Sequence, residues 1–148
     1  MLKFVPVDVQ NIKHLELLKT ISNSTQFLGD VTKYKFHHNP NNIYGNDFIV
    51  LDDSEIIGYL GLTDKVETSM GNTTSIYLAL DPRFYGNGYA KRIVDAVKLE
   101  LSKSRDIDYI VADVSVLNSN GKKSIIKCGF TEIGGDDEEN QYISEKLR

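Results

Sequence analysis

Apolar and polar residues recur along this chain in two rhythms, one typical of strands and one typical of helices. Apolar runs rich in β-branched and aromatic residues predict strands at about 47–52, 55–63, 73–80 and 109–114. From Ala90 to Leu101 the apolar residues instead recur every three or four positions, which predicts a helix over about 87–103. An antiparallel block followed by a β-α-β unit is typical of an α/β sandwich.

The two ends of the chain extend this pattern. Residues 2–5 form a short predicted strand, and Asp8 is placed to cap a helix with an apolar face of Ile12, Leu15, Leu18 and Ile21. Towards the C-terminus the pattern predicts a helix at 119–127 and a hairpin of 130–133 with 141–146. We therefore expect an α/β fold, with a mixed, mostly antiparallel sheet of six to seven strands flanked by helices. Residues 22–46 are expected to form loops and short helices.

The turn before the long helix carries the most informative motif. An apolar strand, 76–80, runs into Asp81-Pro82, and Tyr85-Gly-Asn-Gly-Tyr-Ala90 then leads into the helix. The free N–H groups at a helix start, together with the helix dipole, bind a phosphate without any side chain. Gly86 and Gly88 permit positive φ and a close approach of the backbone. The motif therefore predicts a site for a phosphate-bearing ligand.

Three other interpretations of this turn are weaker. Asn87-Gly88 is also a hairpin signal, but the helical periodicity that follows does not fit a second strand. A Walker loop ends in Gly-Lys-Ser/Thr, but here the second glycine, Gly88, is followed by Tyr89. A Rossmann fingerprint requires a small residue at the position that Lys91 occupies. A nucleotide hydrolase built on the loop stays a minor alternative, and it would release phosphate in a magnesium-dependent way.

Two motifs together resemble the GNAT acyltransferases. The loop Tyr85–Ala90 is similar to the acetyl-CoA loop of that family, Arg/Gln-x-x-Gly-x-Gly/Ala, and Asn118 is followed eleven residues later by Gly129-Phe130, as in its next segment. The resemblance covers about 47–146. It implies a fold in which the strands before and after the cofactor helix splay apart and admit the pantetheine arm. Tyr85 and Gly121-Lys122-Lys123 add some likeness to the branch that acetylates ribosomal-protein N-termini.

This resemblance implies an N-acetyltransferase that moves an acetyl group from acetyl-CoA to a primary amine by direct attack in a ternary complex. The backbone of Leu78 and Leu80 is expected to pair with the pantetheine amides. Asn118 is expected to bind the pantetheine arm, to cap a helix, or to do both. Lys91 either adds a charge beside the phosphates or is simply solvated. The complete predicted set for acetyl-CoA is Leu78, Leu80, Tyr85, Gly86, Asn87, Gly88, Tyr89, Ala90, Lys91 and Asn118.

The catalytic groups are less clearly marked. Ile125 stands where many members carry a tyrosine acid, and Thr74 stands where a glutamate base is common. We expect Thr74 to relay a proton through water and Tyr142 to act as the acid. Deprotonating a lysine-type amine of pKa ~10.4 at pH ~7.4 costs about 4 kcal/mol, against less than about 1 kcal/mol for an α-amine. A weak base therefore slightly favours a peptide N-terminus, and it leaves open a CoA-binding sensor that has lost catalysis.

Other reactive residue types are better explained structurally. Glu67 and the acidic run 136–139 are expected to be solvated. His37-His38 lacks further ligands at metal-binding spacing, so no metal site is expected, and Cys128 lacks a histidine partner and is expected to pack in the core.

Composition narrows the class of protein. The 148 residues suit a single domain spanning 1–148, and a net charge of −4 argues against nucleic-acid binding. One cysteine, no signal-like segment and no apolar run near ~18 residues favour a cytoplasmic protein that does not enter a membrane. The expected partner is a small-molecule or peptide amine. A homodimer formed through the last strand stays open.

Overall fold

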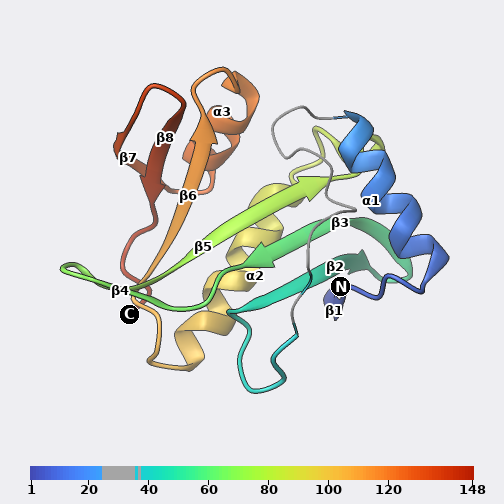
Figure 1. Ribbon diagram of the computed structural model, residues 1–148, viewed down its shortest axis with the longest axis horizontal. Helices are drawn as coiled ribbons and strands as arrows, with labels where there is room; N and C mark the ends of the chain where they lie inside the picture. The colour runs from blue at the N-terminus through green and yellow to red at the C-terminus, as the bar shows by residue number, and fades with distance from the viewer. Residues whose placement is uncertain (25–35, 37) are drawn as a thin grey trace.

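The computed structural model describes residues 1–24, 36 and 38–148 (Figure 1). Within these ranges eight strands form one sheet in the order β1-β2-β3-β5-β6-β8-β7, with β4 paired to β5. The elements in chain order are β1 (Leu2–Pro6), α1 (Ile12–Ser24), β2 (Asn46–Asp52), β3 (Glu55–Leu62), β4 (Val66–Thr68), β5 (Gly71–Leu80), the 3-10 helix η2 (Pro82–Phe84), α2 (Tyr89–Lys103), β6 (Tyr109–Ser115), α3 (Ser119–Lys127), β7 (Thr131–Gly135) and β8 (Glu139–Ile143).

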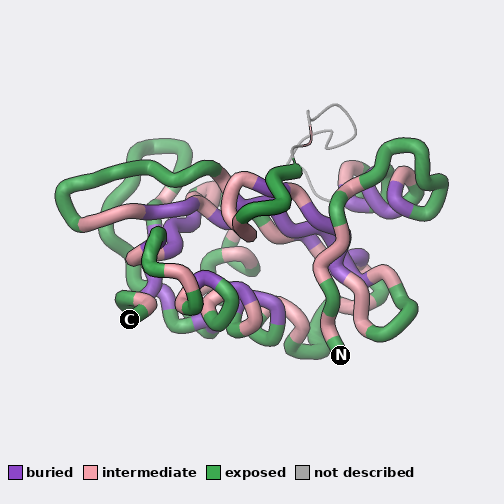
Figure 2. Tube along the Cα trace, turned by 90° about the horizontal axis from the view of Figure 1, so that it is seen from below, coloured by how far each residue is buried: buried purple, intermediate pink, exposed green. Residues whose placement is uncertain are grey.

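Helices cover both faces of the sheet, so its strands contribute side chains to two hydrophobic cores. Along β2, Phe48 and Val50 pack in the core that contains α2, whereas Ile49 between them packs against α1. This alternation follows from the two-residue period of a strand. In Figure 1, α2 accordingly crosses behind the sheet and α1 lies on its other side. Buried segments concentrate in the strands and along one side of α1 and α2 (Figure 2).

The periodicity of α2 agrees with its packing. Ile93, Val94, Val97 and Leu101 are almost fully buried on one face of the helix. Burying an aliphatic side chain of this size contributes about 1.5–3 kcal/mol. These four residues therefore hold α2 across the back of the strands that border the candidate site. None of the described helices is both long and apolar enough to cross a membrane.

Strands β5 and β6 are parallel, but they pair over a short distance only. Thr73–Ser75 pairs with Tyr109–Val111, and beyond Ser75 the two strands diverge, as Figure 1 shows. The remainder of β5, 76–80, stays paired on its other side with β3. The splay that the family resemblance implies is thus present between these two strands.

The direction of the backbone groups of β5 follows from two hydrogen bonds to neighbouring residues of the sheet. The carbonyl of Ser75 accepts the N–H of Thr63 at 3.0 Å, and the N–H of Asp81 donates to the carbonyl of Ile57 at 2.8 Å. Both lie on the β3 side, and the register between the strands has no shift. Because successive residues of a strand point in opposite directions, the N–H and C=O groups of Leu78 and Leu80 face the gap.

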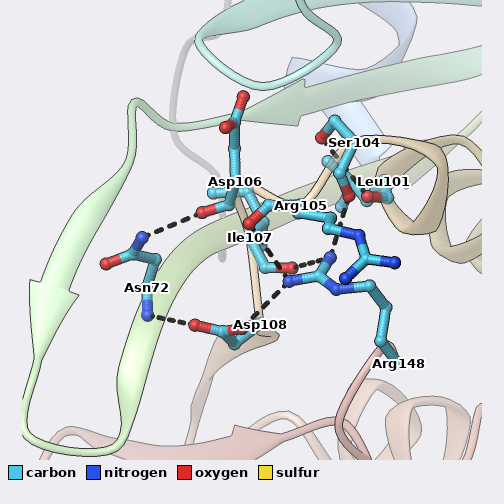
Figure 3. A network of polar contacts seen from close by, with 8 residues as sticks. All are labelled: Asn72, Leu101, Ser104, Arg105, Asp106, Ile107, Asp108 and Arg148. Carbon is cyan, nitrogen blue, oxygen red and sulfur yellow. Dashed lines mark hydrogen bonds and ion pairs between the residues drawn. The ribbon is translucent and has the colours of Figure 1, made fainter.

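The closed end of the gap is held by a polar network around Asp108 (Figure 3). Its carboxylate accepts the backbone N–H of Asn72 at 2.8 Å and the Arg148 guanidinium at 3.1 Å. The Asp108 N–H donates to the Asn72 carbonyl at 2.8 Å, and the Asn72 amide donates to the Asp106 carbonyl at 3.0 Å. Gly71 makes room for this carboxylate, because a Cβ there would lie 2.6 Å from its Oδ2. The network ties the start of β5 to the start of β6.

The structure confirms the α/β class and the mixed, mostly antiparallel sheet, with corrections in detail. The sheet has eight described strands rather than six to seven, because β4 folds back on β5 as a short hairpin. The last strand ends at Ile143 rather than 146. Helix α3 spans 119–127 as expected, and α2 begins at Tyr89, after the glycine turn rather than within it. Residues 25–35 and 37 of the predicted loop region 22–46 lie outside the described residues.

The first helix differs from its prediction in its cap and its face. Asn11, rather than Asp8, caps α1, since its side chain accepts the Lys13 N–H at 3.0 Å, while Asp8 forms the preceding turn with Gln10. Ile12 is 70% exposed, so the predicted apolar face is wrong at this position. The buried residues of the helix are His14, Leu17, Leu18 and Ile21.

Replacing Asp108 tests the network at the closed end of the gap. Asp108→Ala leaves the Asn72 N–H without its acceptor and removes the ion pair of Arg148, whose guanidinium keeps only its backbone carbonyl acceptors. The free energy of unfolding should therefore fall by about 1–3 kcal/mol. Chemical denaturation measures this loss. Glu132→Gln on exposed β7 is the control and should change stability by less than about 0.5 kcal/mol. An equal effect of the two variants would contradict a structural role for the network.

Candidate functional site

The turn before α2 adopts the backbone conformation that its glycines permit. Gly86 has φ +77° and Gly88 has φ +75°, both in the left-handed region. A Cβ on either residue would meet no atom within 4 Å. Glycine is therefore favoured here by backbone conformation, and the space beside the turn is open to a ligand.

The N-terminus of α2 is left uncapped. Its N-cap, Gly88, has no side chain and the cap makes no side-chain hydrogen bond, and the N–H of Arg92 donates to the Gly88 carbonyl at 3.3 Å. By helix geometry the first N–H groups, from Gly88 to Lys91, have no partner within the helix. Helix α3 differs, because the Asn118 side chain accepts the Gly121 N–H at 2.9 Å. The start of α2 thus offers free donors and the positive end of a 15-residue helix.

A buried aspartate fixes the segment that enters the turn. Asp81 is 6% exposed, and it accepts the Arg83 backbone N–H at 3.0 Å and the Arg83 guanidinium at 3.0–3.3 Å. Burial acts to raise the pKa of Asp81, but the hydrogen bonds from Arg83 outweigh it and hold this pKa below its usual value. Asp81 therefore stays ionised and orders η2 immediately before the glycines.

A second contact fixes the segment that leaves the turn. The Tyr89 hydroxyl donates to Asp52 at 2.7 Å, and the Arg92 guanidinium lies 3.5 Å from the same carboxylate and over the Tyr89 ring. The hydrogen bond from Tyr89 is the main cause that lowers the pKa of Asp52. Phe84 packs edge-on against Tyr89 with ring centroids 5.7 Å apart. We call Asp52, Tyr89 and Arg92 the helix-start clamp.

The structure brings most of the predicted acetyl-CoA residues to one place. Leu78 and Leu80 direct their backbone groups into the gap while their side chains pack towards the α2 core. The glycine turn follows η2 directly, and Asn118 lies at the start of α3, just after β6 on the other side of the gap. Among the described residues the Asn118 side chain bonds only through Oδ1, so its amide nitrogen remains available.

The other predicted residues of the turn contribute less than their sequence position indicates. The Tyr85 N–H already donates to the Pro82 carbonyl at 3.2 Å, and its side chain is 55% exposed. The Lys91 ammonium lies 2.7 Å from Asp95, one helical turn further on. Asn87 is exposed and Ala90 is half-buried at the helix start. A charge on Lys91 beside the phosphates stays a prediction.

The hydroxyl predicted to relay a proton is engaged elsewhere. Thr74 is fully buried, and its Oγ1 donates to the Thr63 carbonyl at 2.7 Å. It also lies where β5 is paired with β6, at the closed end of the gap. Its role in catalysis stays a prediction, and this geometry does not favour it.

Tyr142 also lies away from solvent. It is fully buried in the core that contains α2, and its hydroxyl has no hydrogen-bond partner among the described residues. An unsatisfied buried hydroxyl costs about 1–3 kcal/mol. Its role as the acid stays a prediction, whereas the structure shows that its side chain packs in the core.

A second feature, on the opposite face of the sheet, was missed by the sequence reasoning. A cavity of about 600 Å³ lies beside β5, where Tyr77 lines it together with Asp47, Tyr59 and Asp64. Asp47 and Tyr59 lie within strand patterns that were assigned to the sheet alone. Their only signal in the sequence was polarity inside otherwise apolar runs.

Cys128, Glu67 and the acidic run 136–139 lie where the sequence analysis expects them, in the core and at the surface respectively. Cys128 is buried, and burial raises the pKa of its thiol. Glu67 is exposed on β4, and the acidic run 136–139 turns between β7 and β8. His37 lies outside the described residues, and within the described part of the chain no three His, Cys, Asp or Glu side chains gather as a metal site would require.

Comparisons with known proteins agree with this geometry. A family model described as the Acetyltransferase (GNAT) family matches residues 11–130. No curated protein sequence matches the chain significantly.

Three solved structures illustrate the similarity in fold. The spermidine N-acetyltransferase of Vibrio cholerae, in complex with CoA and spermine, has 15% identity and a TM-score of 0.68, over 96% of this chain and 94% of that one. The N-acetyltransferase PseH of Campylobacter jejuni, in complex with acetyl coenzyme A, has 15% identity and a TM-score of 0.69, over 98% and 99%. A GNAT-family acetyltransferase of Streptococcus pneumoniae has 11% identity and a TM-score of 0.74, over 97% and 98%.

Removing the Tyr142 hydroxyl separates packing from acid catalysis. Tyr142→Phe deletes an unsatisfied buried group and keeps the ring, so the free energy of unfolding should rise by about 1 kcal/mol with turnover unchanged. Thermal and denaturant unfolding, together with kcat, measure both effects. A large fall in kcat in a folded variant would instead identify Tyr142 as the acid.

Proposed function

Because the chain belongs to the GNAT family of acetyltransferases, we propose that it transfers the acetyl group of acetyl-CoA to a primary amine by direct attack in a ternary complex. The uncapped start of α2 is the observation that carries this proposal. A phosphate-bearing ligand satisfies the donors from Gly88 to Lys91 that no described side chain caps. The open turn at Gly86 and Gly88 allows that ligand to approach the backbone.

The open edge of β5 supports the choice of CoA as that ligand. The pantetheine arm carries amide groups, and the backbone of Leu78 and Leu80 offers donors and acceptors that β6 leaves unpaired. Asn118 can cap α3 through Oδ1 and donate to the arm through its amide nitrogen. The residues present therefore fit the pyrophosphate and the arm in turn.

In the proposed reaction the amine nitrogen bonds to the acetyl carbon while the carbon–sulfur bond breaks. The nitrogen loses one proton, and the departing sulfur gains one. A backbone N–H facing the gap, such as that of Leu80, polarises the acetyl oxygen, which favours the build-up of negative charge on it. What this chain chiefly contributes is the orientation of the two reactants.

The acceptor, the location and the assembly form part of the proposal. We infer a small-molecule amine in preference to a peptide N-terminus, because a cavity of about 600 Å³ lies beside β5 and a similarly folded protein is a spermidine N-acetyltransferase. A cytoplasmic protein suits the single buried cysteine. The last strand, β8, is paired on both sides, so it is not the exposed edge that the sequence analysis assumed, and a homodimer would instead form through the edge strand β7.

A calorimetric titration with acetyl-CoA, followed by thiol release with a panel of amines, tests the function. Gly88→Ala places a Cβ in the left-handed region, at a cost of about 1–2 kcal/mol, so acetyl-CoA should bind about tenfold more weakly. Gly134→Ala is the matched control, because Gly134 has ordinary φ and open space around it. Binding without amine-dependent thiol release would point to a sensor, and no binding at all would refute the proposal.

The helix-start clamp makes a separate prediction. Tyr89→Phe removes the hydrogen bond to Asp52 and lets the first turn of α2 move, so KM for acetyl-CoA should rise several-fold with KM for the amine unchanged. Asp52→Asn should act in the same direction. Tyr109→Phe on β6 is the control and should leave both constants as they are. Equal changes in the two KM values would show that the clamp does not act through the cofactor turn.

A further inference from the structure

We propose that Asp113 is the general base of the reaction, the group that accepts the proton that an ammonium acceptor must lose before its nitrogen attacks the acetyl carbon. This inference rests on the proposed function, since it names a catalytic residue for that same transfer. Asp113 lies on β6, which borders the gap on the side opposite Leu78 (Figure 1). The gap thus has a carboxylate on one side and the backbone expected to bind the cofactor on the other.

The register of the two parallel strands places Asp113 at the level where the reaction is expected. Ser75 pairs with Val111, and this is the last pair before the strands diverge. By the same register Asp113, two residues further along, stands across the gap from Tyr77, the residue next to Leu78. A strand rises by about 3.3 Å per residue, so Asp113 lies about 7 Å beyond the closed end of the gap, measured along β6. It therefore borders the open part of the gap.

The side chain of Asp113 points to the face of the sheet that α2 does not cover. Its neighbours on β6, Ala112 and Val114, pack in the core that contains α2. Because successive side chains of a strand alternate, the half-buried Asp113 points to the opposite face. Tyr77 lies on that face too, since Leu78 beside it packs in the α2 core. An acceptor can therefore reach both Asp113 and the gap from this face.

Asp113 is the one acidic or histidine side chain on the two strands that border the gap, and both strands are described in full. Aspartate is among the residues least favoured in strands, so strand formation does not explain a carboxylate within the apolar run 109–114. A residue that breaks a local preference in this way is expected at a functional site. Thr74, by contrast, already donates its hydroxyl to the Thr63 carbonyl. Asp113 is therefore the base that the gap offers.

One contact orients the carboxylate and leaves most of its capacity to accept. Gln141, which pairs with Asp113 across β6 and β8, donates its side-chain amide to Asp113 Oδ1 at 3.3 Å. Within the described ranges this is the one hydrogen bond of the Asp113 side chain, and it has no ion pair there. A carboxylate has about four lone-pair positions, so Oδ2 can accept from an ammonium group. Gln141 fixes the direction of the carboxylate without neutralising its charge.

An alkylamine acceptor needs such a group. At pH ~7.4 only about one in a thousand lysine-type amines, of pKa ~10.4, is neutral. The ammonium group loses one proton to Asp113, and the lone pair of the nitrogen then bonds to the acetyl carbon while the carbon–sulfur bond breaks. The second proton that the nitrogen loses balances the one that the sulfur gains, and Asp113 passes the first to water. A general base typically contributes about 10²–10⁴-fold to the rate.

Asp113→Asn tests the inference, because it removes the base but keeps the size of the side chain and an acceptor for Gln141. Thiol release at saturating acetyl-CoA is measured with spermidine, butylamine and alaninamide, and the fastest of the three serves as the probe. For this probe kcat/KM near pH 7 should fall about 100-fold. The Kd of acetyl-CoA, measured by calorimetry, should stay unchanged.

The pH dependence separates a base from a carboxylate with a structural role. Without the base the enzyme can use only amine that is already neutral in solution. Between about pH 6 and 7.5 the kcat/KM of Asp113→Asn should therefore rise about tenfold per pH unit, whereas the wild type, which uses the ammonium form, should change much less. Asp113→Ala should regain part of its turnover when formate is added, because formate supplies a carboxylate in the vacated space.

Glu139→Gln is the matched control. Glu139 is an exposed carboxylate on β8, two residues before Gln141 and so on the same face of the sheet. Its replacement changes the net charge as much as Asp113→Asn does, but kcat/KM should stay within about twofold of the wild type. An equal loss in the two variants would assign the effect to the general charge of this face and would overturn the inference.

The outcomes separate the inference from the proposed function. If folded Asp113→Asn keeps kcat/KM within about threefold of the wild type at each pH, the inference fails and the acetyltransferase stands. A loss that comes with weaker acetyl-CoA binding or a lower unfolding midpoint would also overturn it, because the carboxylate would then be structural. If acetyl-CoA binds but no amine releases thiol, the protein is a sensor and Asp113 has no proton to accept. If acetyl-CoA does not bind, the proposed function itself fails.

Discussion

Pairing between β5 and β6 over only three residues is the constraint from which the candidate site follows. Where Thr73–Ser75 meets Tyr109–Val111 the sheet is continuous, and past that point β5 keeps its partner on one side only. Unpaired strand groups carry a free-energy cost unless water or a ligand satisfies them. The Asp108 network and the α2 core keep the strands in this arrangement, so the open edge is a stable feature of the fold.

The glycine turn follows the end of β5, and a cavity of about 600 Å³ lies beside the same strand, lined in part by Tyr77. On the gap side, Asp81 and the helix-start clamp order the residues before and after the two glycines, so the donors of α2 need little rearrangement to bind an anion. On the other face, Asp47 and Asp64 provide negative charge beside Tyr77. In the proposed function the acyl thioester lies along the open edge of this same strand.

Local patterns in the sequence predicted the elements that depend on local physics. The three- and four-residue recurrence from Ala90 to Leu101 was sufficient to place α2, and α3 begins immediately after its cap, Asn118. The face of α1 was misjudged because a histidine is buried there: the His14 ring accepts the Asp8 N–H at 3.0 Å and so takes a position that an apolar residue was expected to occupy. Asp47, Tyr59 and Asp64 meet only through the pairing of β2 with β3, and no spacing along the chain marks them as a cluster. The glycine turn before α2 was therefore predictable from local sequence, and the cavity beside β5 was not.

Amide hydrogen exchange on β5, with and without acetyl-CoA, tests the central claim most directly. The N–H groups of Leu78 and Leu80 face the gap, whereas that of Ala79 faces β3 and is already paired. Saturating acetyl-CoA should slow exchange at Leu78, Leu80 and the turn residues 86–91 and leave Ala79 nearly unchanged. If Leu78 and Leu80 exchange at the same rate with and without the ligand, acetyl-CoA does not complete the open edge of β5, and the account of this site is wrong.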